Sequence, residues 1–192
     1  MKIPVARLTA SPSEFDFAAD AAWWRSAMPA SPGAPREAPE PIAFRLTAHR
    51  MGEDLLLEGR AEAVLQLECS RCLARYRHGL REVFRLVLEP AGGRTPADPE
   101  AAQALVKDGV CLGDEIEVGW YRGNEIDLDA FFREVVSLAL PVKPLCKEDC
   151  AGLCPHCGID LSERTCDCRE TKVESPFAAL AALRDGPSGG GN

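Results

Sequence analysis

The 192-residue sequence predicts an α+β fold: an antiparallel β-sheet core, a covering helix and a cysteine-rich, zinc-stapled C-terminal segment. The sheet and the helix are predicted by long runs in which apolar and polar residues alternate and by a helical apolar segment before Pro141. The stretch from Cys146 to Cys168 holds six of the nine cysteines and predicts the staple, a segment held in place by metal-bound thiolates. A chain of this length builds its core without crosslinks, so metal ligation accounts for the cysteines better than disulfides do.

Composition and charge narrow the class of protein. The net charge is −8, which argues against a protein that coats nucleic acid without specificity. The first twenty residues lack the apolar core of a signal peptide, and no apolar window is long enough to span a membrane. We therefore expect a soluble, cytoplasmic protein, a compartment in which metal-binding thiols stay reduced.

Residues 1–41 are predicted to contain one helix and a connector. Aromatic residues and alanines from Ser13 to Met28 favour a short amphipathic helix with Ser13 as its cap. The five prolines between Pro29 and Pro41 predict an extended connector, because proline fixes φ and lacks a backbone donor.

Residues 42–144 are predicted to form the α+β core domain. Alternation from Ile42 to His49 and again from Leu55 to Leu67, around a turn at Gly52, predicts an antiparallel pair of strands. A third run, from Tyr76 to Leu88, has one apolar face and one basic face. A proline- and glycine-rich loop with one helical turn up to Val106 follows, with short strands around 116–118 and 125–128.

The last element of this core is a helix whose apolar face runs from Phe131 to Ala139. Asp127 or Asp129 is its predicted cap, and Pro141 ends it. Residues 145–183 are predicted to be the zinc-binding segment with a short helix beginning at Pro176, and residues 184–192 a flexible tail.

The cysteines fall into closely spaced pairs. Two residues between thiols, as in Cys69-Ser-Arg-Cys72 and Cys154-Pro-His-Cys157-Gly, form a tight turn, here called a knuckle, that directs both sulfurs to one ion. Leaving out Cys111, an isolated apolar residue, eight cysteines remain, enough for two zinc sites. We assign the first site to Cys69, Cys72, Cys146 and Cys150, and the second to Cys154, Cys157, Cys166 and Cys168. Exchange of partners between the C-terminal pairs remains open.

Three other uses of the thiols agree less well with the sequence. A thioredoxin-type redox pair opens a helix within a βαβ unit, whereas Cys69 follows a predicted strand. The usual iron–sulfur spacings are absent, and a catalytic zinc keeps an open position with His or carboxylate ligands. A closed structural site therefore agrees best with so many cysteines.

The basic strand is the strongest surface signal. Between Cys69 and Arg85 the chain has one acid and five arginines: Arg71, Arg75, Arg77, Arg81 and Arg85. Their guanidinium groups suit RNA phosphates, and Tyr76 or His78 can stack on an unpaired base. The alternative is a solvated strand face that pairs with acids of the same chain, such as those in 114–117.

The sequence contains no catalytic constellation. It has no dinucleotide fingerprint, P-loop or zinc-protease helix, and its acidic pairs lack a matching nucleophile. We therefore expect neither an enzyme nor a small-molecule substrate.

Three blocks in order resemble the YceD family of large ribosomal RNA subunit accumulation proteins. They are ECSRCL after a long strand, EIDLDAFFREVVSLALPVKPLC, and CKEDCAGLCPHCGIDLSERTCDC followed by SPFAALAAL, and they span Leu55 to Leu183. The resemblance implies a cytoplasmic bacterial or plastid protein, not known to be an enzyme, that is needed for synthesis, processing or stability of 23S rRNA.

Three hypotheses of function follow from these expectations. The first hypothesis is a zinc-stabilised ribosome biogenesis factor whose basic strand contacts rRNA, the precursor large subunit or a ribosomal protein. The second is a protein–protein adapter whose acidic surface docks a basic ribosomal protein. A thiol or metal redox protein is the third.

Overall fold

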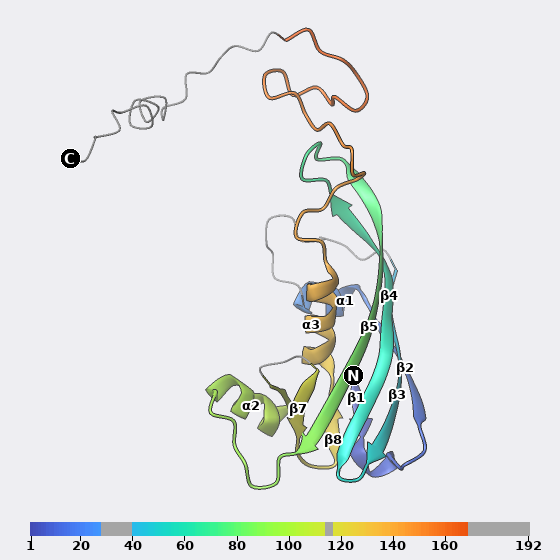
Figure 1. Ribbon diagram of the computed structural model, residues 1–192, viewed down its shortest axis with the longest axis vertical. Coiled ribbons are helices and arrows are strands. Elements are labelled where there is room, and N and C mark those ends of the chain that lie inside the picture. Colours follow the sequence, from blue (N-terminus) through green and yellow to red (C-terminus); the bar gives the residue numbers. More distant parts are fainter. Residues whose placement is uncertain (28–39, 114–116, 169–192) are drawn as a thin grey trace, which may run out of the picture.

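The computed structural model describes residues 1–27, 40–113 and 117–168 (Figure 1). Across these residues the protein has the predicted α+β fold, with a six-stranded, mostly antiparallel sheet in the order β2-β3-β4-β5-β7-β6 and a two-stranded sheet of β1 and β8. The strands are β1 (Lys2–Pro4), β2 (Ser13–Ala19), β3 (Ile42–Met51), β4 (Asp54–Glu68), β5 (Arg75–Pro90), β6 (Val110–Leu112), β7 (Val118–Tyr121) and β8 (Glu125–Asp127). The helices are the 3-10 helix η1 (Val5–Arg7), α1 (Ala21–Ala27), α2 (Pro99–Lys107) and α3 (Asp129–Ala139).

The long hairpin of β4 and β5 is the backbone of the sheet. Its register runs from Leu55 opposite Leu88 to Glu68 opposite Arg75, so both strands are paired along nearly their whole length. The predicted alternation is confirmed: Leu57 and Leu86 are buried on the inner face of the sheet. Figure 1 shows the far end of this hairpin extending beyond α3, with the cysteine-rich segment above it.

Helix α3 covers the inner face of the sheet and completes the core. The ring of Phe132 stacks on that of Phe44 of β3, with centroids 4.2 Å apart, and Phe131 meets the edge of Phe84 of β5 at 5.4 Å. The predicted cap was wrong in detail. The N-cap position is Leu128, which makes no side-chain capping bond, while Asp127 Oδ1 accepts a hydrogen bond from the backbone N–H of Asp129 at 3.0 Å.

The predicted N-terminal helix from Ser13 to Met28 was also wrong. Ser13–Ala19 form strand β2, which pairs antiparallel with β3, and of the residues described in this range only Ala21–Ala27 are helical. The acids that suggested the first turn of a helix lie instead on the exposed side of β2, where Asp16 alternates with half-buried aromatic residues. The helix begins after Asp20, whose Oδ1 accepts hydrogen bonds from the backbone N–H groups of Ala22 and Trp23 at 2.9 and 2.8 Å.

The region after β5 has more regular structure than the sequence suggested. The single helical turn expected before Val106 is part of α2, whose first turn is capped by Asp98. Strand β6 was not predicted, and β7 pairs parallel to β5 from Val87 to Pro90. These strands are only three and four residues long, too short to produce a clear alternation.

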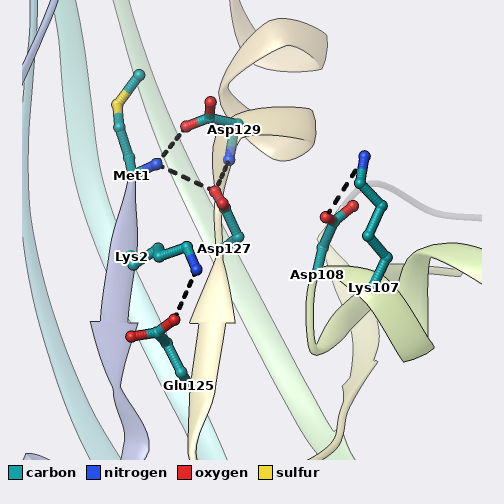
Figure 2. Close-up of polar contacts among 7 residues, drawn as sticks. All are labelled: Met1, Lys2, Lys107, Asp108, Glu125, Asp127 and Asp129. Carbon is teal, nitrogen blue, oxygen red and sulfur yellow. Dashed lines mark hydrogen bonds and ion pairs between the residues drawn. The ribbon is translucent and has the colours of Figure 1, made fainter.

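Ion pairs link the chain at β1 to the chain at β8 in the small sheet (Figure 2). The amino group of Met1 donates hydrogen bonds to Asp127 Oδ1 at 3.0 Å and to Asp129, and Lys2 Nζ lies 2.8 Å from Glu125 Oε1. Burial lowers the pKa of the amino group, but the bonds to the two aspartates outweigh burial and leave that pKa raised. Burial likewise opposes ionisation of Asp127, yet the Asp129 N–H and the amino group lower its pKa.

Some predictions fall on residues outside the described ranges. They concern most of the connector up to Pro41, the acids in 114–116, the helix beginning at Pro176 and the tail at 184–192. Among the described residues, no helix is both long and apolar enough to cross a membrane.

Candidate metal centres and basic strand

The first thiol cluster joins the end of β4 to the chain that follows α3. Cys69 comes directly after β4, Cys72 ends the knuckle, and Cys146 and Cys150 lie beyond α3. The Sγ atoms of all four lie within 4.8 Å of one another, with Cys69 and Cys150 3.7 Å apart and Cys72 and Cys146 also 3.7 Å apart. Cys69, Cys72 and Cys150 are buried, so this cluster is largely shielded from solvent.

Backbone hydrogen bonds bring the two parts of the chain together. The N–H of Ser70 donates to the carbonyl of Pro144 at 2.8 Å, and the N–H of Leu153 donates to the carbonyl of Arg71 at 3.1 Å. The guanidinium of Arg71 donates to the carbonyl of Cys150 at 2.8 Å. The knuckle is thus fixed to the C-terminal segment by the protein itself as well as by the thiols.

The second thiol cluster is built within the C-terminal segment. Cys154, Cys157, Cys166 and Cys168 place their Sγ atoms within 4.8 Å of one another, and those of Cys154 and Cys166 are 3.4 Å apart. Cys157 and Cys168 are exposed. The same donor set therefore occurs twice, once largely buried and once at the surface.

The two knuckles share one backbone geometry. In the first, the Cys69 N–H donates to the carbonyl of Ala74 and the Leu73 N–H donates to the carbonyl of Cys69, both at 2.9 Å. In the second, the Cys154 N–H donates to Ile159 at 2.8 Å and the Gly158 N–H donates to Cys154 at 2.9 Å. Both knuckles therefore have the same pattern of backbone hydrogen bonds around their first cysteine.

The donor sets fit a tetrahedral metal ion. A thiolate binds zinc at about 2.3 Å, so the corners of such a tetrahedron lie about 3.8 Å apart. The sulfur separations of 3.4 to 3.7 Å are close to that value and well beyond the roughly 2 Å of a disulfide bond. Both clusters can hold a metal ion.

The electrostatics of the thiols also favours a cation. Burial opposes ionisation of Cys69, but nearby backbone N–H groups lower its pKa to about 6. The backbone N–H groups of Cys157 and His156 lower the pKa of Cys154 to about 6. Burial and the neighbouring thiols raise the pKa of Cys146 to about 12, and the hydrogen bond to Cys157 does the same for Cys168. One thiol of each cluster thus ionises readily, and a bound dication would stabilise the ionised form of the other three thiols.

The arginines of β5 lie on the outer face of the sheet. Arg77 is 3.3 Å from Glu40, Arg81 is 3.4 Å from Glu62, and Arg85 is 3.6 Å from Glu58. Arg81 nevertheless remains 83% exposed. These three arginines thus form ion pairs within the chain, which was the alternative to RNA binding. Their partners lie on β4 and just before β3.

Arg71 is placed differently from the other arginines. Its guanidinium contacts the carbonyls of Cys150 and Glu148, so it lies against the first cluster. Sequence reasoning also missed Ser162, whose Oγ is 3.8 Å from Cys150 Sγ and accepts from the Ala151 N–H. A serine so far from the first knuckle carries no spacing signal. Cys111 packs with Ala91 and Leu105, apart from both clusters, and burial raises its pKa.

Comparison with known proteins identifies the family. The model of the family "Large ribosomal RNA subunit accumulation protein YceD" matches residues 57–184. The chain is 24% identical to "Large ribosomal RNA subunit accumulation protein YCED homolog 1, chloroplastic" of Arabidopsis thaliana, over 76% of this chain and 49% of that protein. It is 32% identical to an uncharacterized protein of Mycobacterium tuberculosis, over 72% of this chain and 59% of that protein.

The homologue of the same name from Zea mays is 25% identical, over 70% of this chain and 50% of the relative. The chain thus spans about half the length of the curated relatives that it matches. No solved structure matches it. The family model covers both knuckles, α3 and the outer arginines, and on that match the chain belongs to the YceD family of large ribosomal RNA subunit accumulation proteins.

Proposed function

We propose that this protein is a non-enzymatic, cytoplasmic ribosome biogenesis factor that supports synthesis, processing or stability of 23S rRNA. Membership of the YceD family supports the proposal, as do the plant relatives named for accumulation of the large ribosomal RNA subunit. In this proposal the chain binds precursor rRNA through the outer face of β5, and two structural zinc ions hold the end of that strand in place.

The zinc ions would act by fixing backbone geometry. Cys69, Cys72, Cys146 and Cys150 would hold one ion, and Cys154, Cys157, Cys166 and Cys168 the other. A structural zinc ion contributes about 10–16 kcal/mol in small finger peptides, most of which is folding free energy. The first ion would join the knuckle after β4 to the segment after α3, the place where β5 and its arginines begin.

The observation that carries the RNA proposal is the row of arginines on one exposed strand face. Arg75, Arg77, Arg81 and Arg85 all have exposed side chains on β5. Surface ion pairs of the kind formed with Glu58 and Glu62 are worth about 0–1 kcal/mol, so phosphates can replace those glutamates. Arg71 donates to the Cys150 carbonyl, so in this proposal it positions the knuckle. The other four arginines would contact the phosphates.

Charge reversal with a matched control tests this proposal. The double variant Arg77→Glu/Arg81→Glu should bind a 23S rRNA fragment at least about tenfold more weakly at low salt, because two phosphate contacts become repulsive. The control Arg7→Glu/Lys107→Glu changes the net charge equally, at exposed residues of η1 and α2. An equal loss in both variants would indicate bulk charge, and no loss in either would refute the RNA face.

The adapter hypothesis predicts a different outcome. A basic ribosomal protein would copurify after nuclease treatment, and both double variants would retain it or bind it more tightly. That result, with no affinity for rRNA, would replace the RNA proposal.

A further inference from the structure

Among the described residues, one edge of β5 has no strand partner over most of its length. On one side β5 pairs with β4 from Arg75 to Leu88, whereas on the other side β7 pairs with it only from Val87 to Pro90. In the part of the chain that the structure describes, backbone bonding on this second side begins at Val87, whose N–H donates to the Glu117 carbonyl at 2.8 Å. The stretch from Tyr76 to Leu86 is longer than a typical strand of about 5–6 residues, and such an edge is a template for another strand.

A groove lies beside this edge. It has a volume of about 180 Å³, and its lining residues are Glu82, Val83, Phe84 and Arg85 of β5, Phe131, Val135 and Leu138 of α3, and Glu117. Val83 is 77% exposed and Leu138 is 64% exposed, although both are apolar. Figure 1 shows α3 running alongside β5 above β7, the neighbour of β5 on this side of the sheet.

We propose that this edge binds an extended segment of a partner protein as an added β-strand, and that acidic and apolar residues alternate in that segment. Backbone hydrogen bonds to the open edge would supply affinity, and side chains in the groove would supply specificity. The new strand would lie end to end with β7 on the same side of β5.

Charge complementarity selects the acidic positions. Arg77, Arg81 and Arg85 lie on the outer face, and the ion pairs of the last two with β4 use the Nε atom. A guanidinium has five N–H donors, so donors remain for carboxylates on a strand added at the opposite side. The alternate side chains of that strand would face the groove, where Glu82 and Glu117 disfavour acids and Leu138 favours apolar residues.

A second copy of this chain suits the edge poorly. If the β5 edges of two copies pair about a two-fold axis, the outer faces of the two strands form one face of the joined sheet. A pairing centred on Val83 would set Arg81 opposite Arg85 of the other copy, and a pairing centred on Arg81 would set Arg77 opposite Arg85. Like charges directly opposite each other are destabilising, so the arginines favour an acidic strand over self-association.

The test uses the full chain and two labelled peptides. In one peptide Glu and Val alternate, and in the other Lys and Val alternate. Fluorescence anisotropy should show binding of the Glu–Val peptide alone, and amide hydrogen exchange should slow between Tyr76 and Leu86. Leu138→Glu should weaken binding about tenfold, because it places a charge in the apolar groove. Val106→Glu, at a residue of α2 that is 76% exposed and outside the groove, should leave it unchanged.

The other outcomes contradict the proposal. Equal binding of both peptides, binding that survives Leu138→Glu, or unchanged amide exchange would exclude an added acidic strand. Protection of Tyr76–Leu86 by the protein's own dimerisation, or by single-stranded RNA in a manner sensitive to Leu138→Glu, would assign the edge to another partner. Because Leu138 is outside the proposed RNA face, its variant should still bind the 23S rRNA fragment, so failure here is distinct from failure of the proposed function.

Discussion

Leu73 and Gly158 occupy the same position in the two knuckles, and both have positive φ angles, of 60° and 74°. Each donates its N–H to the carbonyl of the first cysteine of its turn. The second knuckle thus has the residue that adopts this conformation most easily, whereas the first has a branched side chain that is 56% exposed. We therefore expect the leucine side chain to contribute little to the stability of its own knuckle.

Exchange of residues at this position should affect the two knuckles to different extents. Leu73→Gly should change the free energy of unfolding by no more than about 1 kcal/mol, because relief of the left-handed backbone offsets the flexibility of glycine. Gly158→Leu should destabilise the second cluster by about 1–2 kcal/mol through backbone strain alone, since a Cβ there meets nothing within 4 Å. Urea unfolding with zinc present measures both. A large loss for Leu73→Gly would show that its side chain is needed for packing.

A chelator should remove metal from the second cluster before the first. The second cluster has two exposed cysteines, whereas the first has three buried ones, so a chelator reaches the second more easily. We expect amide exchange to rise in residues 154–168 while residues 69–72 are still protected. Hydrogen exchange during a titration with a zinc chelator measures this order. Simultaneous loss would mean that the two clusters unfold as one unit.

Arg71 should stabilise the first cluster, and Arg75 should not. Arg71→Ala removes the donor to the Cys150 carbonyl and should cost about 1–2 kcal/mol of stability, with faster loss of metal from this site. Arg75→Ala is the matched control, because Arg75 is an exposed residue of β5 next to the same knuckle. The rate of zinc release to a chromogenic chelator distinguishes them. Equal rates would remove Arg71 from the support of the cluster.

The ion pair between Met1 and Asp127 should make stability depend on pH. The raised pKa of the amino group gives a contribution that is complete below about pH 8 and is lost as pH rises through the folded value. The lowered pKa of Asp127 gives one that is present above about pH 4 and is lost as pH falls through its folded value. Asp127→Asn should therefore cost about 1 kcal/mol near pH 6 and progressively less toward pH 10 or pH 2. Urea unfolding across this range checks the prediction, and a constant difference would contradict it.

The sequence predicts best where a pattern is long or chemically specific. The alternation of β4 and β5 extends over many residues, and paired cysteines have few alternative uses, so the hairpin and both groups of thiols could be predicted. The N-terminal strand was mistaken for a helix because its alternation is short and is followed by a true helix. Pairing with β3 in the folded protein stabilises the strand conformation of this segment.

Features that depend on contacts distant in sequence could not be predicted. The bond from Arg71 to Cys150 joins residues that only the fold brings together. The same holds for the acids that pair with the arginines, since Glu58 and Glu62 face Arg85 and Arg81 through the register of the hairpin. Among the described residues, the open edge of β5 depends on where β7 begins, at Val118 opposite Val87, which no local pattern records.

The central claim is that the chain holds two zinc ions, each bound by four cysteines, and that the first fixes the end of the β4–β5 hairpin. Metal analysis of the purified chain, together with the variants Cys69→Ser/Cys72→Ser and Cys154→Ser/Cys157→Ser, tests it most directly. The predicted result is two zinc ions per chain for the unmodified protein and one for each variant. A single zinc ion in the unmodified protein, or none together with oxidised cysteines, would contradict it.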